Sequence, residues 1–202
     1  MLRYEDERVE VHSVVVGYLA TNVYVPRCKH TGNAVLIDAA DDAPRLVRLC
    51  RTLGVERVLE THGHHDHVAA VPGVRAAGYR VGIAPEDAHN LDGHDFDLVD
   101  GEVFEVGKLR LRTIFTPGHT PGSTSFLLDG DQPLLFGGDT LFPGGPGATR
   151  PKNGGHFPTI IRTLEERLFT LDPATLVLPG HGADTTIGTE LPHLQEWIER
   201  GW

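Results

Sequence analysis

The first third of the chain alternates apolar and polar positions in a way that predicts strands before helices. Alternating or continuous β-branched runs predict three consecutive strands joined by short turns, at Val9–Val16, Thr21–Pro26 and Asn33–Asp38. Asp42 and Pro44 then indicate the start of a helix, because an acidic cap and an early proline favour initiation, and Gly54 ends it. A short apolar strand over Val55–Leu59 follows and leads directly into a histidine-rich segment.

The rest of the chain also predicts strands interspersed with helices. The pattern predicts a helix over Val68–Ala77, which Gly78 ends. It predicts further strands at Arg80–Ala84, Glu102–Val106, Lys108–Phe115, Thr124–Asp129, Pro133–Phe136 and Thr175–Leu178. Apolar spacing predicts two more helices, over residues 160–169 and 191–198. Strands followed by strand–helix units in both halves favour an α/β fold of two packed sheets with helices outside.

Composition excludes several classes of function. The 202 residues suit one domain, and the net charge of −10 argues against a nucleic-acid or membrane-surface partner, since both require positive charge. The charged first ten residues do not resemble a secretory signal, and no apolar run is long enough to span a bilayer. The two cysteines, Cys28 and Cys50, cannot form a disulfide framework. We therefore expect a single domain over residues 1–202 in the reducing environment of the cytoplasm.

The histidines are the first candidates for a chemical function. The chain has 12 histidines, and the pattern His62-x-His64-x-Asp66-His67 follows the strand that ends at Leu59. Irregular backbone after a strand can turn four polar side chains toward one point. His62 and His64 can then reach one metal ion, while Asp66 and His67 point to a second.

Three further candidates, His119, Asp139 and His181, come just after predicted strands. Glycine or proline flanks each of them, as expected where the backbone bends sharply to present a side chain. Together the two sets supply five imidazoles and two carboxylates. This mixture suits zinc, and less selectively iron or manganese.

These motifs resemble the metal signature of the metallo-β-lactamase superfamily. The flanks Thr-Pro-Gly-His119-Thr-Pro-Gly-Ser, Gly-Asp139-Thr-Leu-Phe and Pro-Gly-His181-Gly are similar to its glyoxalase II-like branch, the hydroxyacylglutathione hydrolases. The resemblance implies a four-layer αββα sandwich with a dinuclear site at one edge. By position it implies a first metal held by His62, His64 and His119, a second held by Asp66, His67 and His181, and Asp139 as the bridging ligand.

Differences from other branches of the superfamily narrow the set of branches that the chain resembles. Secreted β-lactamases of this fold typically carry a cysteine where this chain has Asp139, and persulfide dioxygenases lack the final motif histidine, which is present here as His181. RNA-processing relatives share all seven ligands but need a basic surface that a chain of net charge −10 does not offer. Ala70 replaces a frequent glycine, and from the short stretch after His181 we expect no C-terminal helical domain of the kind that glyoxalase II has.

The resemblance therefore implies a zinc-dependent metallohydrolase acting on a small molecule. Two metals lower the pKa of a shared water toward about 7, so a bridging hydroxide can attack a carbonyl, and Asp66 can orient the water and shuttle its proton. A thioester is the favoured substrate, because a thiolate leaving group suits zinc, and lactones and other esters stay open. The alternatives are a mononuclear-iron oxidoreductase resembling the persulfide dioxygenases, and a non-catalytic metal-binding module.

The Gly- and Pro-rich segment Phe142–Gly155 is expected to form an irregular loop over the metals, because it directly follows Asp139. It carries Arg150 and Lys152, two cations in an acidic chain. We expect them to bind the anionic part of a substrate. The sequence leaves the oligomeric state and the thiol carrier open.

Overall fold

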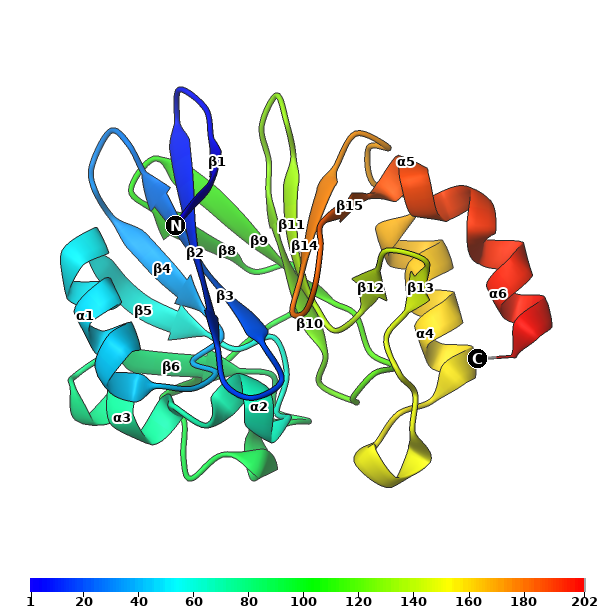
Figure 1. Ribbon diagram of the computed structural model, residues 1–202, viewed down its shortest axis with the longest axis horizontal. Helices are drawn as coiled ribbons and strands as arrows, with labels where there is room; N and C mark the ends of the chain where they lie inside the picture. Colours follow the sequence, from blue (N-terminus) through cyan, green and yellow to red (C-terminus); the bar gives the residue numbers. More distant parts are fainter. Residues whose placement is uncertain (202) are drawn as a thin grey trace.

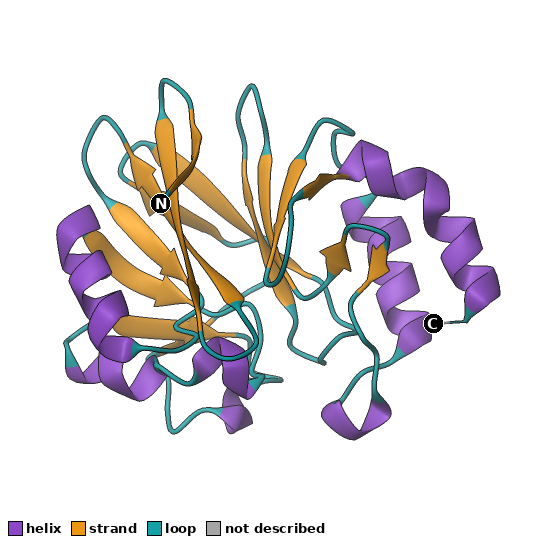
Figure 2. Ribbon diagram, viewed as in Figure 1, coloured by secondary structure: helices purple, strands orange, loops and turns teal. Residues whose placement is uncertain are grey.

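The computed structural model describes residues 1–201 and shows two β-sheets packed face to face, with helices on both outer faces (Figures 1 and 2). The first sheet has its strands in sequence order: β1 (Leu2–Glu5), β2 (Val9–Val16), β3 (Thr21–Cys28), β4 (Ala34–Ile37), β5 (Val55–Leu59), β6 (Arg80–Ile83) and β7 (Phe96–Asp97). The second sheet has the order β15 (Thr185–Thr186), β14 (Leu176–Pro179), β11 (Leu134–Gly138), β10 (Thr124–Leu128), β9 (Leu109–Phe115) and β8 (Val103–Val106).

The helices form the two outer layers. On the first sheet lie α1 (Ala43–Leu53), α2 (His65–Val68) and α3 (Val71–Ala76), and on the second lie α4 (Phe157–Thr163), the π-helical turn η3 (Leu164–Leu168), α5 (Ile187–Glu190) and α6 (Leu194–Arg200). Separate apolar clusters hold each outer layer to its sheet: Leu46 and Val74 pack on the first, and Leu164 and Trp197 on the second. The expected four-layer αββα sandwich is confirmed.

A third apolar cluster fills the space between the two sheets. Phe126 and Phe136 are fully buried there, and the Tyr24 ring lies 5.6 Å from that of Phe136. Strand β2 begins with the expected alternation, since Val9 and Val11 are buried and Glu10 between them is half-buried. This core fixes the spacing of the sheets, and so of the loops at their ends.

Several predicted boundaries are confirmed because local signals set them. Strands β2 and β5 occupy the predicted residues, and the Asp42 side chain caps α1 by accepting from the Arg45 N–H. Gly54 ends α1 with a φ of 74°, in the left-handed region that glycine tolerates. Strand β1, at Leu2–Glu5, was not predicted, because its charged residues obscure the apolar pattern.

The single helix predicted over Val68–Ala77 is wrong. The chain instead forms α2 and α3, and α2 begins inside the histidine cluster. Pro72, in the first turn of α3, has no N–H and interrupts the helical hydrogen bonds, while the Ala70 N–H donates to the Ala39 carbonyl (2.8 Å). The break lets the cluster adopt its own turn.

The segment predicted as an irregular loop after Asp139 has some regular structure. It contains the two-residue strands β12 (Leu141–Phe142) and β13 (Gly145–Pro146), and the 3₁₀ turn η2 (Pro151–Asn153). None of the helices in residues 1–201 has the length and apolar character that a membrane span needs.

The inter-sheet core generates a stability prediction. Phe136→Ala should lower the free energy of unfolding by about 3–5 kcal/mol, because it removes a fully buried ring between two sheets that cannot collapse onto the cavity. Denaturant unfolding measures the change. Val99→Ala, at a residue that is 59% exposed, is the control and should change the value by less than about 0.5 kcal/mol. A similar small loss for Phe136→Ala would contradict this packing.

Candidate metal centre

All seven side chains singled out in the sequence lie together at one end of the sandwich. Their loops follow four strands: the histidine cluster follows β5, His119 lies between β9 and β10, Asp139 follows β11, and His181 follows β14. Strands β4 and β5 are parallel, as are β11 and β14. Carboxyl ends of parallel strands lie at the same edge of a sheet, so the fold brings these loops to one place.

The first group is made of three imidazoles. His62 Nε2 lies 3.1 Å from His64 Nδ1, and His119 Nε2 lies 2.9 Å from the same atom. Burial, followed by the charge of neighbouring imidazoles, lowers the pKa of His62 well below its usual value, and burial also lowers the pKa of His119. Both rings are therefore neutral at pH 7, which is the form that binds metal ions.

The second group joins a carboxylate to two imidazoles. His181 Nε2 lies 3.2 Å from both Asp66 Oδ2 and His67 Nε2. Burial opposes ionisation of Asp66, but the interactions with His181 and the charge of His67 together outweigh this effect and lower the pKa of the carboxyl to about 2. Asp66 is therefore ionised at any physiological pH.

Asp139 lies between the two groups. Its Oδ1 is 3.4 Å from His67 Nε2, and its Oδ2 is 3.6 Å from both His119 Nε2 and His181 Nε2. Burial raises its pKa, but the neighbouring imidazoles outweigh burial and the net pKa is below the usual range. Asp139 can therefore present an ionised oxygen to each group.

The residues present fit two divalent cations. The ligand atoms of each group lie within 4.8 Å of one another, and Asp139 Oδ1 is buried without a hydrogen-bond partner among the described residues. An unpaired buried carboxylate oxygen is costly unless a cation satisfies it. The donors are imidazole and carboxylate, a set that suits zinc, iron or manganese.

A hydrogen bond at Nδ1 orients four of the five imidazoles. Each of these bonds leaves Nε2 facing the space that the seven ligands share, as in protein metal sites. The pairs are His62 with Thr61 Oγ1 (3.1 Å), His67 with Asp38 Oδ2 (2.8 Å), His119 with the Ala148 carbonyl (2.7 Å) and His181 with the Leu19 carbonyl (3.1 Å).

Sequence reasoning missed Asp38, the most connected of these partners. It follows β4 with a φ of 66° and accepts from the Thr61 N–H (2.7 Å), the Thr61 hydroxyl (2.9 Å) and His67 Nδ1. Nearby Glu60 is buried and accepts from the Ala39 N–H, and burial with the Asp38 charge raises its pKa well above normal. An acidic residue directly after the apolar run 34–37 was the available signal.

Glycines allow the ligand loops to approach closely. A Cβ on Gly180 would overlap Asp139 Oδ1 and lie 2.6 Å from His67 Cε1. A Cβ on Gly147 would overlap the Asp139 carbonyl. These two positions therefore require glycine for a reason beyond the local bend.

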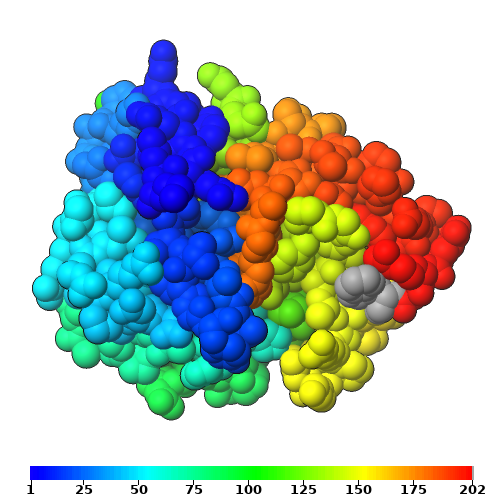
Figure 3. Space-filling model, viewed as in Figure 1, coloured from blue at the N-terminus to red at the C-terminus, as the bar shows by residue number. Residues whose placement is uncertain are grey.

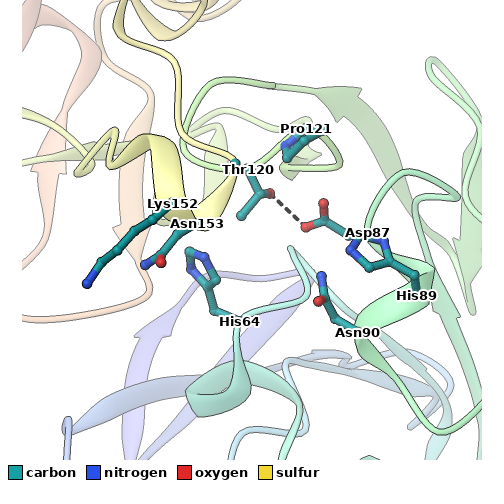
Figure 4. A pocket seen from close by; sticks show the side chains of 9 residues that line it. His64, Asp87, His89, Asn90, Thr120, Pro121, Lys152 and Asn153 are labelled. Atoms are coloured by element: carbon teal, nitrogen blue, oxygen red, sulfur yellow. Dashed lines mark hydrogen bonds between the residues drawn. The ribbon is translucent and has the colours of Figure 1, made fainter.

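A polar cavity of about 430 Å³ opens beside the first group. Its lining residues are His64, Asp87, His89, Asn90, Thr120, Pro121, Lys152, Asn153 and Gly154. Figure 4 shows Lys152 and Asn153 on one side, with Asp87, His89 and Asn90 on the other. In Figure 3 the surface is hollowed between the β2–β3 hairpin and the segment that carries η2. Of the two loop cations, Lys152 lines the cavity, while Arg150 precedes η2 and is exposed.

Comparison with known proteins gives a consistent assignment. The model of the metallo-beta-lactamase superfamily matches residues 16–181. A hydroxyacylglutathione hydrolase of Polaromonas sp. is 38% identical over 162 residues, which are 78% of this chain and 60% of that protein. The probable metallo-hydrolase YqgX of Bacillus subtilis is 36% identical over 160 residues, which are 66% of this chain and 71% of that protein. The chain thus spans less than two thirds of the hydroxyacylglutathione hydrolase.

Solved structures agree with these relatives. The BLEG-1 B3 metallo-beta-lactamase superposes with a TM-score of 0.82 at 28% identity, covering 91% of this chain and 97% of that one. TTHA1623 in a di-iron-bound form gives 0.73 at 30% identity, covering 89% and 96%. ETHE1 from Myxococcus xanthus gives 0.78 at 29% identity, covering 91% and 82%. The expected likeness to the glyoxalase II-like branch is confirmed. The structural neighbours also include a protein named as a B3 metallo-beta-lactamase and one named ETHE1.

The geometry generates a prediction about the ligands. His64→Ala and Asp139→Ala should lose bound metal, whereas His65→Ala should retain it, because His65 is exposed and belongs to neither group. Metal content per chain after gel filtration is the measurement. If His65→Ala loses metal as completely as His64→Ala, the assignment of ligands is wrong.

Proposed function

Because this chain belongs to the metallo-β-lactamase superfamily of metallo-hydrolases, we propose that it is a dinuclear-metal hydrolase that cleaves a thioester or a related ester. The observation that carries the proposal is the position of Asp139 between two complete groups of ligands. A single metal would leave the ligand atoms of one of these groups without a cation to bind.

The metal assignment follows from the donors. His62, His64 and His119 would hold the first metal, Asp66, His67 and His181 the second, and Asp139 would contact both. Zinc is the proposed metal because imidazole-rich sites suit it, and iron or manganese fits the same donors. When bound, the two ions lower the pKa of a water toward about 7 and polarise the carbonyl of the substrate.

Asp66 is the proposed catalytic residue. Its side chain is 19% exposed and ionised, and its Oδ2 lies 3.2 Å from His181 Nε2. In this position the carboxylate can orient an attacking water and pass its proton toward the leaving group. No serine or cysteine nucleophile is required, and both cysteines are buried in the apolar core.

The cavity beside His64 is the proposed substrate site. Its volume of about 430 Å³ suits a small molecule, and its walls offer amide, imidazole and ammonium groups. We assign Lys152, at the cavity wall, and Arg150, on the segment before it, to the anionic part of a thiol carrier. A thioester is favoured over an oxygen ester because a thiolate leaving group suits zinc, and a lactone is the alternative within the same chemistry.

A different activity has one observation in its favour. The alternative is a mononuclear-iron oxidoreductase acting on a thiol or persulfide, and the observation is that the three imidazoles of the first group also suit iron. His181 argues for the hydrolase, because with Asp66 and His67 it completes a second group of donors. We also propose a cytoplasmic location, which the two free cysteines support.

Metal content and substrate range test the proposed reaction together. The purified protein should hold close to two metal ions per chain, lose thioester hydrolysis on chelation and regain it when zinc is returned. A panel of thioesters, lactones and phosphoesters measures the preference. One iron per chain with oxygen consumption on a persulfide would instead support the oxidoreductase.

The two loop cations give a prediction about substrate binding. Arg150→Ala and Lys152→Ala should each raise KM for a carboxylate-bearing thioester by roughly two- to fivefold, with kcat much less affected. The reason is that an exposed cation paired with the substrate carboxylate stabilises the bound substrate and the transition state equally. Steady-state kinetics on charged and neutral esters provides the measurement. Arg51→Ala, which removes an exposed cation from α1, is the matched control and should change neither constant. Equal losses on charged and neutral substrates would show that the loop shapes the cavity and does not bind charge.

A further inference from the structure

His64 is held differently from the other four imidazoles of the site. Each of the others has a hydrogen bond on the ring nitrogen that faces away from the shared space. His64 Nε2 is buried and has no hydrogen-bond partner among the described residues. The ring must therefore take its position from its backbone. This dependence is strong, because His64 faces its neighbours through Nδ1, the ring nitrogen nearest the backbone.

A buried carboxylate holds that backbone. Asp87 is fully buried, and its Oδ2 accepts from the N–H of Gly63 (2.8 Å), the residue between His62 and His64. The same oxygen accepts from the hydroxyl of Thr120 (2.7 Å), which directly follows His119. Figure 4 shows this second bond at the wall of the cavity. One oxygen thus joins the two loops that supply all three imidazoles of the first group.

Two glycines leave room for Asp87 beside its hydrogen-bond donors. Its Oδ1 accepts a third bond, from the Gly122 N–H (2.8 Å). A Cβ on Gly122 would lie 2.7 Å from Asp87 Cγ, and a Cβ on Gly63 would lie 2.8 Å from the Asp87 carbonyl oxygen. Larger residues at 63 or 122 would therefore push the carboxylate away from its donors.

We propose that Asp87 is a positioning residue that assembles the first metal site by holding the Gly63 backbone N–H and the Thr120 hydroxyl, and so supplies for His64 the anchor that its ring lacks. The proposal rests on the proposed dinuclear centre but not on any substrate. A carboxylate is needed because three donors point at two oxygens. An amide has one acceptor oxygen and would turn its NH₂ toward at least one of them.

Metal titration in two single-site backgrounds tests this role. His181→Ala leaves only the first site intact, and His119→Ala leaves only the second. Metal-free proteins are titrated with Zn²⁺ by calorimetry and with Co²⁺ by visible absorption. Asp87→Ala should weaken binding about 10- to 100-fold in the His181→Ala background, as loss of an outer partner does at metal sites, and leave it unchanged in the His119→Ala background.

Matched variants separate positioning from general stability. Thr120→Val removes one donor and should weaken the first site in the same direction, whereas Thr120→Ser keeps the hydroxyl and should restore it. Glu86→Ala, at the exposed neighbour of Asp87, should have no effect. If Asp87→Ala does not fold, the comparison of Thr120→Val with Thr120→Ser decides the question.

The outcomes are distinguishable. Equal weakening in both backgrounds, or none in either, overturns the role of Asp87. Equal metal binding by Thr120→Val and Thr120→Ser overturns it as well. If the unmodified protein binds fewer than two ions per chain, the dinuclear centre itself is wrong, and that result is independent of Asp87.

Discussion

Five imidazoles and two carboxylates at one end of the sandwich must be held by hydrogen bonds that the sheet ladders do not supply. Near the second group, the Asp38 carboxylate joins the backbone and hydroxyl of Thr61 to His67 Nδ1. Beside the first group, the Asp87 carboxylate joins the N–H groups of Gly63 and Gly122 to the hydroxyl of Thr120. Both carboxylates are buried, and N–H and O–H groups donate hydrogen bonds to them. The arrangement of the ligand loops depends on these two carboxylates.

Sheet topology explains why the loops meet. The parallel pairs β4–β5 and β11–β14 place the histidine cluster, Asp139 and His181 beyond the carboxyl ends of their strands. The apolar core between the sheets holds these two edges at a fixed separation. Glycine at 180 then permits an approach that any side chain would block. The site is thus rigid because its supports belong to the core.

Within one fold, substrate choice is decided by residues that bind no metal. The same scaffold is shared by proteins named as a lactamase, a hydroxyacylglutathione hydrolase and ETHE1, so the fold alone does not select the reaction. In this chain the cavity walls come from the segment after β6 and from η2, on opposite sides of His64. Asp87 is buried and fixed by its hydrogen bonds, but the exposed cavity residues of these segments can vary without disturbing the core, which makes them the natural place for specificity; they are His89, Asn90, Lys152 and Asn153.

Local signals in the sequence determined much of this protein. An alternating run predicted β2 and a short apolar run predicted β5, Asp42 and Gly54 predicted the ends of α1, and the spacing of the histidine motif predicted side chains that the fold brings together. Pro72 is a local signal for the break between α2 and α3, whereas the roles of Asp38 and Asp87 were decided by the tertiary structure. Asp87 bonds to Gly63 and Thr120, residues distant in sequence, and no periodicity or turn preference encodes such a contact. Propensity and patterning act over neighbouring residues, whereas a buried carboxylate takes its function from the donors that folding places around it.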